Sequence, residues 1–192
     1  MPIFFLLLGF LLQTPAPAVP LQPAPGNPVV VIETSAGSIT AELFKDRAPV
    51  STENFLQYAR DEHYAGTIWH RVVSGYVIQG GGYTPALVER GTRPPIQNEA
   101  TNGLSNRRGT LAMARLRSAR SATSQFYINV ANNGALDHRG YGPDDFGYAV
   151  FGRVLEGMDV VDKIATVLTT TRDGMESVPV TPILIKSVTE RK

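Results

Sequence analysis

The chain has 192 residues, a length that suits one ordinary domain whose core needs no disulfides or metals for stability. Its 18 Lys and Arg and 17 Asp and Glu give a net charge of +1, which favours neither nucleic acid nor an anionic membrane surface as a partner. The sequence contains no cysteine, and this excludes disulfide bonds, thiol catalysis and zinc–thiolate sites.

The first 18 residues have the pattern of a secretory signal peptide. Residues 3–12 are apolar apart from Gly9, a run too short to span a bilayer as a helix. Residues 16–18 read Ala-Pro-Ala, the small-x-small pattern of a cleavage site. We therefore expect a signal peptide at 1–18 and no stable membrane span. Because no Lys or Arg precedes the apolar run, an uncleaved membrane tether and a disordered apolar tail are the alternatives.

A proline-rich segment follows the signal. Six prolines lie between residues 13 and 28, a density that prevents a helix and favours an extended, solvated polyproline conformation. We predict that residues 19–28 are a spacer in front of the folded domain. The alternative, a ligand for a proline-recognition module, lacks the basic residue that often flanks such ligands.

Two antiparallel strands and a helix are predicted to open the domain. Residues 29–34 are mostly β-branched and read as a strand, and residues 38–44 read as its return strand after a turn at Ala36-Gly37. Pro49 suits the first turn of the helix that follows, and this helix carries an apolar stripe.

The rest of the chain reads as more short strands and a second helix. Residues 83–108 are polar and punctuated by Gly and Pro, which predicts loops. Residues 158–165 read as the second helix and residues 183–188 as the last strand. Many short strands with two helices favour an antiparallel barrel.

Two stretches resemble the floor of a peptide-binding groove. Residues 69–82 place Arg71, Tyr76 and Gln79 on two β-branched runs around a Ser-Gly turn, and residues 124–129 set an amide beside aromatic rings. Gln79 lies eight positions after Arg71, so the two share a strand face only if the turn preserves the register. Neither stretch offers a nucleophile, a metal cluster or an acid–base pair. A reaction without bond cleavage, such as rotation about a prolyl amide, fits such a site.

Four segments of the chain resemble the cyclophilin-type peptidyl-prolyl cis–trans isomerases. They are HRVVSGYVIQGG at 70–81, GTLAMAR at 109–115, SQFYI at 124–128 and YAVFG at 148–152. The resemblance runs from about Val29 to about Val188, and the segment NEATNGLSN at 98–106 resembles the bacterial branch.

The resemblance implies a mainly β fold and an isomerase activity. The fold would be a closed eight-stranded antiparallel barrel with a helix at each end, over a domain of residues 29–190. The activity would be acceleration of X–Pro amide rotation in folding proteins, without cofactor or metal. Together with the apolar leader, the bacterial resemblance predicts an exported, periplasmic protein, with membrane tethering as the alternative.

Two catalytic residues are implied by the resemblance. Arg71 would donate to the prolyl nitrogen, because its guanidinium stays charged and presents a planar fork. Gln79 would bond the substrate backbone and hold Arg71. Without the resemblance, a surface salt bridge explains Arg71 better, and Gln79 could belong to a polar network inside the barrel.

The resemblance also implies a slot for the proline ring with a backbone grip beside it. Positions 114 and 115 would grip the peptide backbone through their own backbone donors. Read alone, Met113 and Phe126 would be ordinary core residues, but the resemblance implies that they wall the slot. The expected substrate-binding residues are Tyr76, Met113, Ala114, Arg115, Gln125, Phe126, Leu136 and Tyr148.

The chain departs from the family pattern at three positions. Arg115 replaces the more usual asparagine, which leaves the substrate preference open. Ala135 stands where many eukaryotic relatives carry tryptophan, and Tyr148 where many carry histidine. Loss of the indole removes a large wall and an N–H donor, so we expect weak cyclosporin binding.

Other function classes have weak support. The arginines between 107 and 120 are interleaved with Ser and Ala rather than aromatic residues, which favours a solvated loop over a nucleic-acid site. The three histidines show no metal-ligand spacing. We expect a monomeric isomerase that acts on proline-containing polypeptides. A non-catalytic module that binds proline peptides as a chaperone is the alternative, and retention of Arg71 argues against it.

Overall fold

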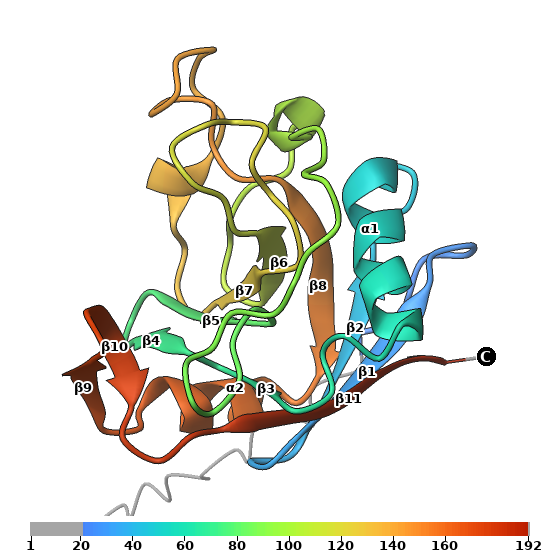
Figure 1. Ribbon diagram of the computed structural model, residues 1–192. Helices are drawn as coiled ribbons and strands as arrows, with labels where there is room; N and C mark the ends of the chain where they lie inside the picture. Colours follow the sequence, from blue (N-terminus) through green and yellow to red (C-terminus); the bar gives the residue numbers. More distant parts are fainter. Residues whose placement is uncertain (1–20, 192) are drawn as a thin grey trace, which may run out of the picture.

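The computed structural model describes residues 21–191, which form a curled antiparallel sheet with two helices (Figure 1). Nine strands join the sheet in the order β3-β11-β1-β2-β8-β6-β7-β5-β4, and β9 and β10 form a separate hairpin. The strands are β1 (Val29–Thr34), β2 (Ser38–Leu43), β3 (Thr67–Ile68), β4 (Arg71–Val73), β5 (Val77–Gly80), β6 (Thr110–Met113), β7 (Phe126–Asn129), β8 (Val150–Glu156), β9 (Thr169–Arg172), β10 (Met175–Pro179) and β11 (Leu184–Arg191).

The mainly β fold agrees with the prediction, but the closed eight-stranded barrel does not. Within residues 21–191 no hydrogen-bonded ladder joins the edge strands β3 and β4, so the sheet is an open half-barrel of nine strands. Only Trp69 and His70 separate these two strands in the chain. Because this interruption divides the run 67–73, its first part pairs with β11 and its second part with β5. The division adds a strand and leaves the ladder open.

Two helices lie against different ends of the curled sheet, as the sequence predicts (Figure 1). Helix α1 (Pro49–Arg60) begins with its proline in the first turn, where no intrahelical N–H bond is lost. Helix α2 (Met158–Ala165) follows Gly157, which has a φ of +89°. A Cβ atom at this position would lie 2.4 Å from the Ser38 carbonyl oxygen, so there is no room for a side chain. The short 3₁₀ helices are η1 (Ala100–Asn102) and η2 (Gly134–Leu136).

Aromatic rings fill the core between α1 and the concave face of the sheet. The ring of Phe55 lies 5.0 Å from that of Tyr64, 5.1 Å from that of Phe126 and 5.3 Å from that of Phe151. A second, smaller cluster lies on the other face of β5, β6 and β7. Its buried members are Val77, Ala112, Ala114, Tyr127 and Val150, with Phe44, Tyr76, Leu104, Leu136 and Tyr148 packed against them.

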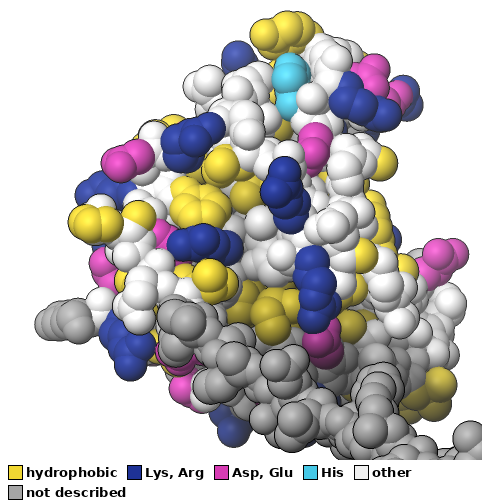
Figure 2. Space-filling view, turned by 180° about the vertical axis from the view of Figure 1, so that it is seen from behind, with side chains coloured by type: hydrophobic (Ala, Val, Ile, Leu, Met, Phe, Trp, Pro, Cys, Tyr) yellow, Lys and Arg dark blue, Asp and Glu magenta, His cyan; other side chains and the backbone are white. Residues whose placement is uncertain are grey.

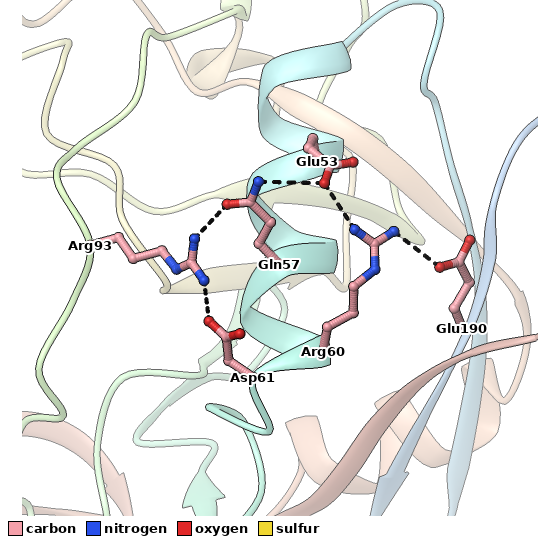
Figure 3. Close-up of polar contacts among 6 residues, drawn as sticks. All are labelled: Glu53, Gln57, Arg60, Asp61, Arg93 and Glu190. Atoms are coloured by element: carbon pink, nitrogen blue, oxygen red, sulfur yellow. Dashed lines mark hydrogen bonds and ion pairs between the residues drawn. The ribbon is translucent and has the colours of Figure 1, made fainter.

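Charged side chains fix the outer face of α1 (Figure 3). Arg60 bridges Glu53 at 2.9 Å and Glu190 of β11 at 3.3 Å, while Arg93 bonds Gln57 and pairs with Asp61. All these ion pairs are half exposed, so each contributes little to the stability of the protein. On the face in Figure 2, Lys and Arg side chains lie singly among acidic and uncharged ones rather than as one basic patch.

The described part of the predicted spacer, residues 21–28, is exposed but anchored to the domain. The buried carboxylate of Glu42 accepts hydrogen bonds from the Ala24 backbone N–H at 2.6 Å and from Asn27 Nδ2 at 2.7 Å. The Leu43 N–H donates to the Pro28 carbonyl at 2.8 Å. These bonds hold residues 24–28 against β2. The predicted signal peptide lies outside the described residues.

Among residues 21–191, no helix is both long enough and apolar enough to cross a membrane.

Candidate active site

A tight hairpin brings Arg71 and Gln79 together. Strands β4 and β5 pair with Val73 opposite Val77 and Arg71 opposite Gln79. The three-residue loop between them contains Gly75 at a φ of +69°, the left-handed conformation that such a loop requires. Because the register is preserved across this loop, the side chains of the two polar residues leave the same face. The Arg71 Nη1 atom lies 3.4 Å from the Gln79 Oε1 atom.

A chain of amide contacts continues from this pair along the surface. Gln79 Nε2 donates to Gln125 Oε1 at 3.0 Å, and Gln125 Nε2 lies 3.5 Å from Glu89 Oε1. Within residues 21–191, Arg71 forms no ion pair, and Gln79 is the one side chain that its guanidinium contacts by a hydrogen bond. The amide chain therefore orients the guanidinium and leaves its charge without a carboxylate partner.

A cavity of about 250 Å³ opens beside Arg71, and we call it the Arg71 pocket. Six of its nine lining residues are aromatic or aliphatic, but polar atoms make up most of the exposed lining, and the Arg71–Gln79 pair supplies one polar edge. Its lining residues are Arg71, Tyr76, Val77, Gln79, Ala114, Arg115, Tyr127, Leu136 and Tyr148. A concave site that combines aromatic and aliphatic side chains with placed polar groups suits a small ligand or a single residue of a peptide.

Six of the expected substrate-binding residues lie at this site, and two do not. Tyr76, Ala114, Arg115, Leu136 and Tyr148 line the Arg71 pocket, and Gln125 lines a neighbouring one. The expected walls Met113 and Phe126 are instead buried in the main core.

The burial of Met113 and Phe126 in the core, away from the pocket, has a simple geometric reason. Successive side chains of a strand point to opposite faces, so a shift of one residue exchanges core for pocket. In β7 the ring that reaches the pocket is therefore that of Tyr127, while Phe126 points to the core. In β6 the same alternation separates Met113 from Ala114, and in β5 the sequence analysis missed Val77 as a wall.

A buried asparagine forms hydrogen bonds behind the pocket wall. Asn106 Oδ1 accepts the Tyr127 hydroxyl at 2.8 Å, and Asn106 Nδ2 donates to Asp137 Oδ1 at 3.0 Å. Leu136 and Tyr148 are tied to each other by a backbone hydrogen bond of 3.0 Å. Because its hydroxyl is satisfied inside the protein, Tyr127 contributes an apolar ring to the pocket wall. The sequence analysis missed Asn106, since its partners are more than 20 positions away.

A second cavity of about 350 Å³ adjoins the Arg71 pocket, and we call it the Gln125 cavity. It shares Gln79, Ala114 and Arg115 with the first. Its remaining lining is mostly polar and consists of Tyr83, Glu89, Thr92, Leu116, Ser121, Thr123 and Gln125. A peptide lying across Ala114 and Arg115 would place side chains in both cavities.

The histidine beside Arg71 and two tyrosines of the pocket are held uncharged at neutral pH. Burial, together with a smaller effect of the nearby Arg71 charge, lowers the pKa of His70 to about 4, so its imidazole is neutral. Burial also raises the pKa of Tyr76 and, more strongly, that of Tyr127. Across residues 21–191 no three His, Cys, Asp or Glu side chains are grouped so that they could hold a metal ion. The groups at this site suit binding and charge stabilisation rather than proton transfer.

Comparison with curated proteins and solved structures gives consistent results. A peptidyl-prolyl cis-trans isomerase from Streptomyces antibioticus is 53% identical over 158 residues, covering 82% of this chain and 95% of that protein. Peptidyl-prolyl cis-trans isomerase B of Escherichia coli (strain K12) is 49% identical over 162 residues, covering 84% of this chain and 98% of that protein.

A crystal structure of a Cryptosporidium parvum cyclophilin-type isomerase, determined in the presence of the dipeptide Ala-Pro, matches the fold. Its TM-score is 0.73 at 25% sequence identity, and the match covers 85% of this chain and 99% of that one. The family described as "Cyclophilin type peptidyl-prolyl cis-trans isomerase/CLD" matches residues 29–190. The chain therefore belongs to the cyclophilin-type peptidyl-prolyl cis-trans isomerases.

Proposed function

We propose that the protein lowers the barrier to X–Pro rotation in folding polypeptides through Arg71, with the proline ring held in the Arg71 pocket. Rotation breaks amide resonance and localises a lone pair on the prolyl nitrogen, at a barrier of about 18–20 kcal/mol. A guanidinium directed at that nitrogen stabilises the twisted amide more than the planar one, which is the requirement for catalysis. An acceleration of about 10⁵ requires a barrier reduction of about 7 kcal/mol.

The observation that carries this proposal is the placement of Arg71. Its guanidinium lies at the edge of the Arg71 pocket, is oriented by Gln79 at 3.4 Å, and has no carboxylate partner among residues 21–191. A guanidinium neutralised by a carboxylate would stabilise developing charge less. The amide chain from Gln79 to Gln125 restricts the side chain without neutralising it. This preorganisation is the feature that makes electrostatic stabilisation effective.

The test is proline isomerisation in a short Xaa-Pro peptide, measured without a coupling protease. We expect Arg71→Ala to lower kcat/KM by roughly two to three orders of magnitude, about 3–4 kcal/mol of transition-state stabilisation, while the fold is retained. Arg117→Ala is the matched control, because Arg117 is an exposed arginine outside both cavities. Full activity in a folded Arg71→Ala variant would remove Arg71 from the mechanism.

A non-catalytic chaperone module that holds proline peptides is the second candidate for how the site acts on folding clients. It predicts that Arg71→Ala changes peptide affinity and prevention of aggregation without a catalytic effect. The oriented, unneutralised guanidinium favours the catalytic proposal, because a pocket that only binds has no use for it.

The protein is, in this proposal, an exported member of the bacterial branch that acts in the periplasm. The support is the apolar run at 3–12 and the Ala-Pro-Ala sequence at 16–18. Mass spectrometry of protein from the native cell should find an N-terminus near Val19. An intact Met1 in the membrane fraction would support the tethered alternative, and an intact Met1 in cytosolic protein would refute export. The monomeric state also stays a prediction.

A further inference from the structure

Arg115 differs from Arg71, the other arginine that lines the pocket, because hydrogen bonds within the protein occupy nearly all of its guanidinium. Nε donates to the Gly147 carbonyl at 2.9 Å and Nη2 to the Pro143 carbonyl at 3.0 Å. Nη1 donates to the carbonyls of Leu116 and Arg117 at 3.0 and 3.1 Å. All but one of its N–H groups are therefore occupied by backbone oxygens.

These bonds join two loops that are far apart in sequence. One loop, residues 114–121, follows β6, and the other, residues 137–147, follows η2 and lies at the top of Figure 1. The second loop is also tied by Asn98, whose Nδ2 donates to the same Gly147 carbonyl at 3.1 Å. Gly147 itself has a φ of +79°, and a Cβ there would lie 2.6 Å from the His138 nitrogen. The Gly147 carbonyl is thus a fixed point at which Arg115 holds the loop.

The face of the same guanidinium covers a wall of the Arg71 pocket. Its central carbon lies 4.6 Å from the ring centroid of Tyr148, a cation–π distance. Tyr148 also meets the ring of Tyr127 edge-on at 5.9 Å. Tyr148 therefore contacts both Arg115 and Tyr127, and both rings line the pocket.

We propose that Arg115 is a positioning residue for the isomerase reaction: its side chain clasps the 114–121 and 137–147 loops and fixes Tyr148 as a pocket wall, rather than contacting the substrate. This revises the expectation that the residue binds substrate, and it leaves a peptide grip at this position to the backbone. The inference rests on the proposed use of the Arg71 pocket for proline. Its consequence is that Arg115 sets substrate affinity by preorganisation and leaves the rotation step to Arg71.

Kinetics provide the first part of the test. We expect Arg115→Ala to raise KM about tenfold while kcat stays within about twofold, because an interaction equal in ground and transition states is lost. Arg117→Ala is the matched control, because Arg117 connects the same two loops through an ion pair with Asp144 at 3.5 Å. Both side chains of this pair are about four-fifths exposed, so KM should change less than about twofold. An unchanged KM in Arg115→Ala would overturn the proposal.

Proteolysis without substrate provides the second part, and its outcome does not depend on how Arg71 acts. Tyr141, 83% exposed in the 137–147 loop, is a chymotrypsin site that the clasp restrains. We expect cleavage there at least about fivefold faster in Arg115→Ala and unchanged in Arg117→Ala, with thermal unfolding nearly the same. A raised KM with unchanged cleavage would mean that Arg115 contacts the substrate directly, and would overturn the proposal.

Arg115→Lys separates geometry from charge. A lysine keeps a cation near Tyr148, but its single ammonium cannot reach carbonyls on both loops as the guanidinium fork does. We expect both KM and the cleavage rate of this variant to lie between those of the wild type and Arg115→Ala. Full recovery by lysine would show that charge alone is sufficient, and the clasp would be refuted.

Discussion

Phe126 and Tyr127 are neighbours in β7, yet their rings lie on opposite sides of the sheet. Phe126 meets Phe55 edge-on at 5.1 Å inside the main core, whereas Tyr127 meets Tyr148 edge-on at 5.9 Å beside the Arg71 pocket. One peptide bond therefore separates a residue that stabilises the fold from one that shapes the site. Substitutions at these two positions should separate stability from substrate binding.

Phe126→Ala should lower the free energy of unfolding by about 3–5 kcal/mol, because the ring is fully buried and its removal leaves a cavity. Urea denaturation followed by the fluorescence of Trp69 would measure the change. Where the variant is folded, its peptide affinity should remain close to that of the wild type. A loss of affinity without a loss of stability would place this ring in the pocket instead of the core.

Tyr127→Leu should weaken binding of a short Xaa-Pro peptide about tenfold, because it removes a ring that lines the Arg71 pocket. Tyr127→Phe is the matched control. It keeps the ring and loses only the 2.8 Å hydrogen bond to Asn106, at a stability cost of about 1 kcal/mol. Titration of each folded variant with the peptide would measure affinity, and equal affinities for both variants and the wild type would contradict this assignment.

The sequence predicts which segments form the site better than it predicts which side chains face it. Arg71 and Gln79 lie an even number of positions apart on the two strands of a hairpin, so a single assumption about the turn places them together. Gly75 in a three-residue loop meets that assumption. In β7, by contrast, all four residues are buried. No alternation of polar and apolar residues marks the two faces there, and the choice between Phe126 and Tyr127 depends on tertiary packing.

Contacts made across long sequence separations explain the remaining differences. The carbonyls that Arg115 binds at Pro143 and Gly147 lie 28 and 32 positions away, and no local sequence pattern predicts these contacts. The open sheet has a similar origin, because Trp69 and His70 separate β3 from β4 and these two strands pair with different partners. Local propensity identifies the strands, but the ends of their ladders depend on partners elsewhere in the chain.

His70 should make the protein less stable in mild acid. The unfolded chain takes up a proton on this imidazole below about pH 6.5, whereas in the folded protein its pKa is about 4. Between these values protonation favours the unfolded state, so stability falls as pH falls, by about 3 kcal/mol in total. The free energy of unfolding should be measured for the wild type and for His70→Asn from pH 7 to pH 4. The stability advantage of the wild type over the variant should shrink by this amount as the pH falls. A constant difference would mean that folded His70 titrates near its ordinary value.

Glu42 should anchor residues 21–28 only while its carboxyl group is ionised. Burial raises the pKa of this carboxyl, but hydrogen bonds from Asn27, Ala24 and Arg153 outweigh burial and place the pKa below its ordinary value. Its contribution is therefore present at neutral pH and is lost as pH falls through the folded pKa.

Glu42→Gln should lower the free energy of unfolding by about 1–3 kcal/mol at pH 7 and by less in acid, with isomerase activity unchanged. The control Glu33→Gln lies on the same hairpin, where Glu33 bonds only Ser38 at an exposed position, and should change stability by less than about 0.5 kcal/mol. Denaturation at several pH values would measure both variants. An equal effect of the two substitutions would show that the buried carboxylate is not an anchor.

Cyclosporin should inhibit this protein weakly, and Ala135→Trp should strengthen the inhibition. Ala135 is exposed in η2, next to the pocket residue Leu136, and its methyl group is not part of the pocket wall. An indole at this rim would add an apolar surface and an N–H donor, which is commonly worth a few kcal/mol in a buried contact.

We expect affinity for cyclosporin roughly a hundredfold below that of tryptophan-bearing relatives, and a partial gain of about tenfold in Ala135→Trp, since Tyr148 also shapes the outer groove. Ala24→Trp, the same substitution on the segment that Glu42 anchors, should give no gain. Tight inhibition of the unmodified protein would show that another side chain takes the place of the indole, and an absence of any gain from Ala135→Trp would show that position 135 does not face the bound ligand.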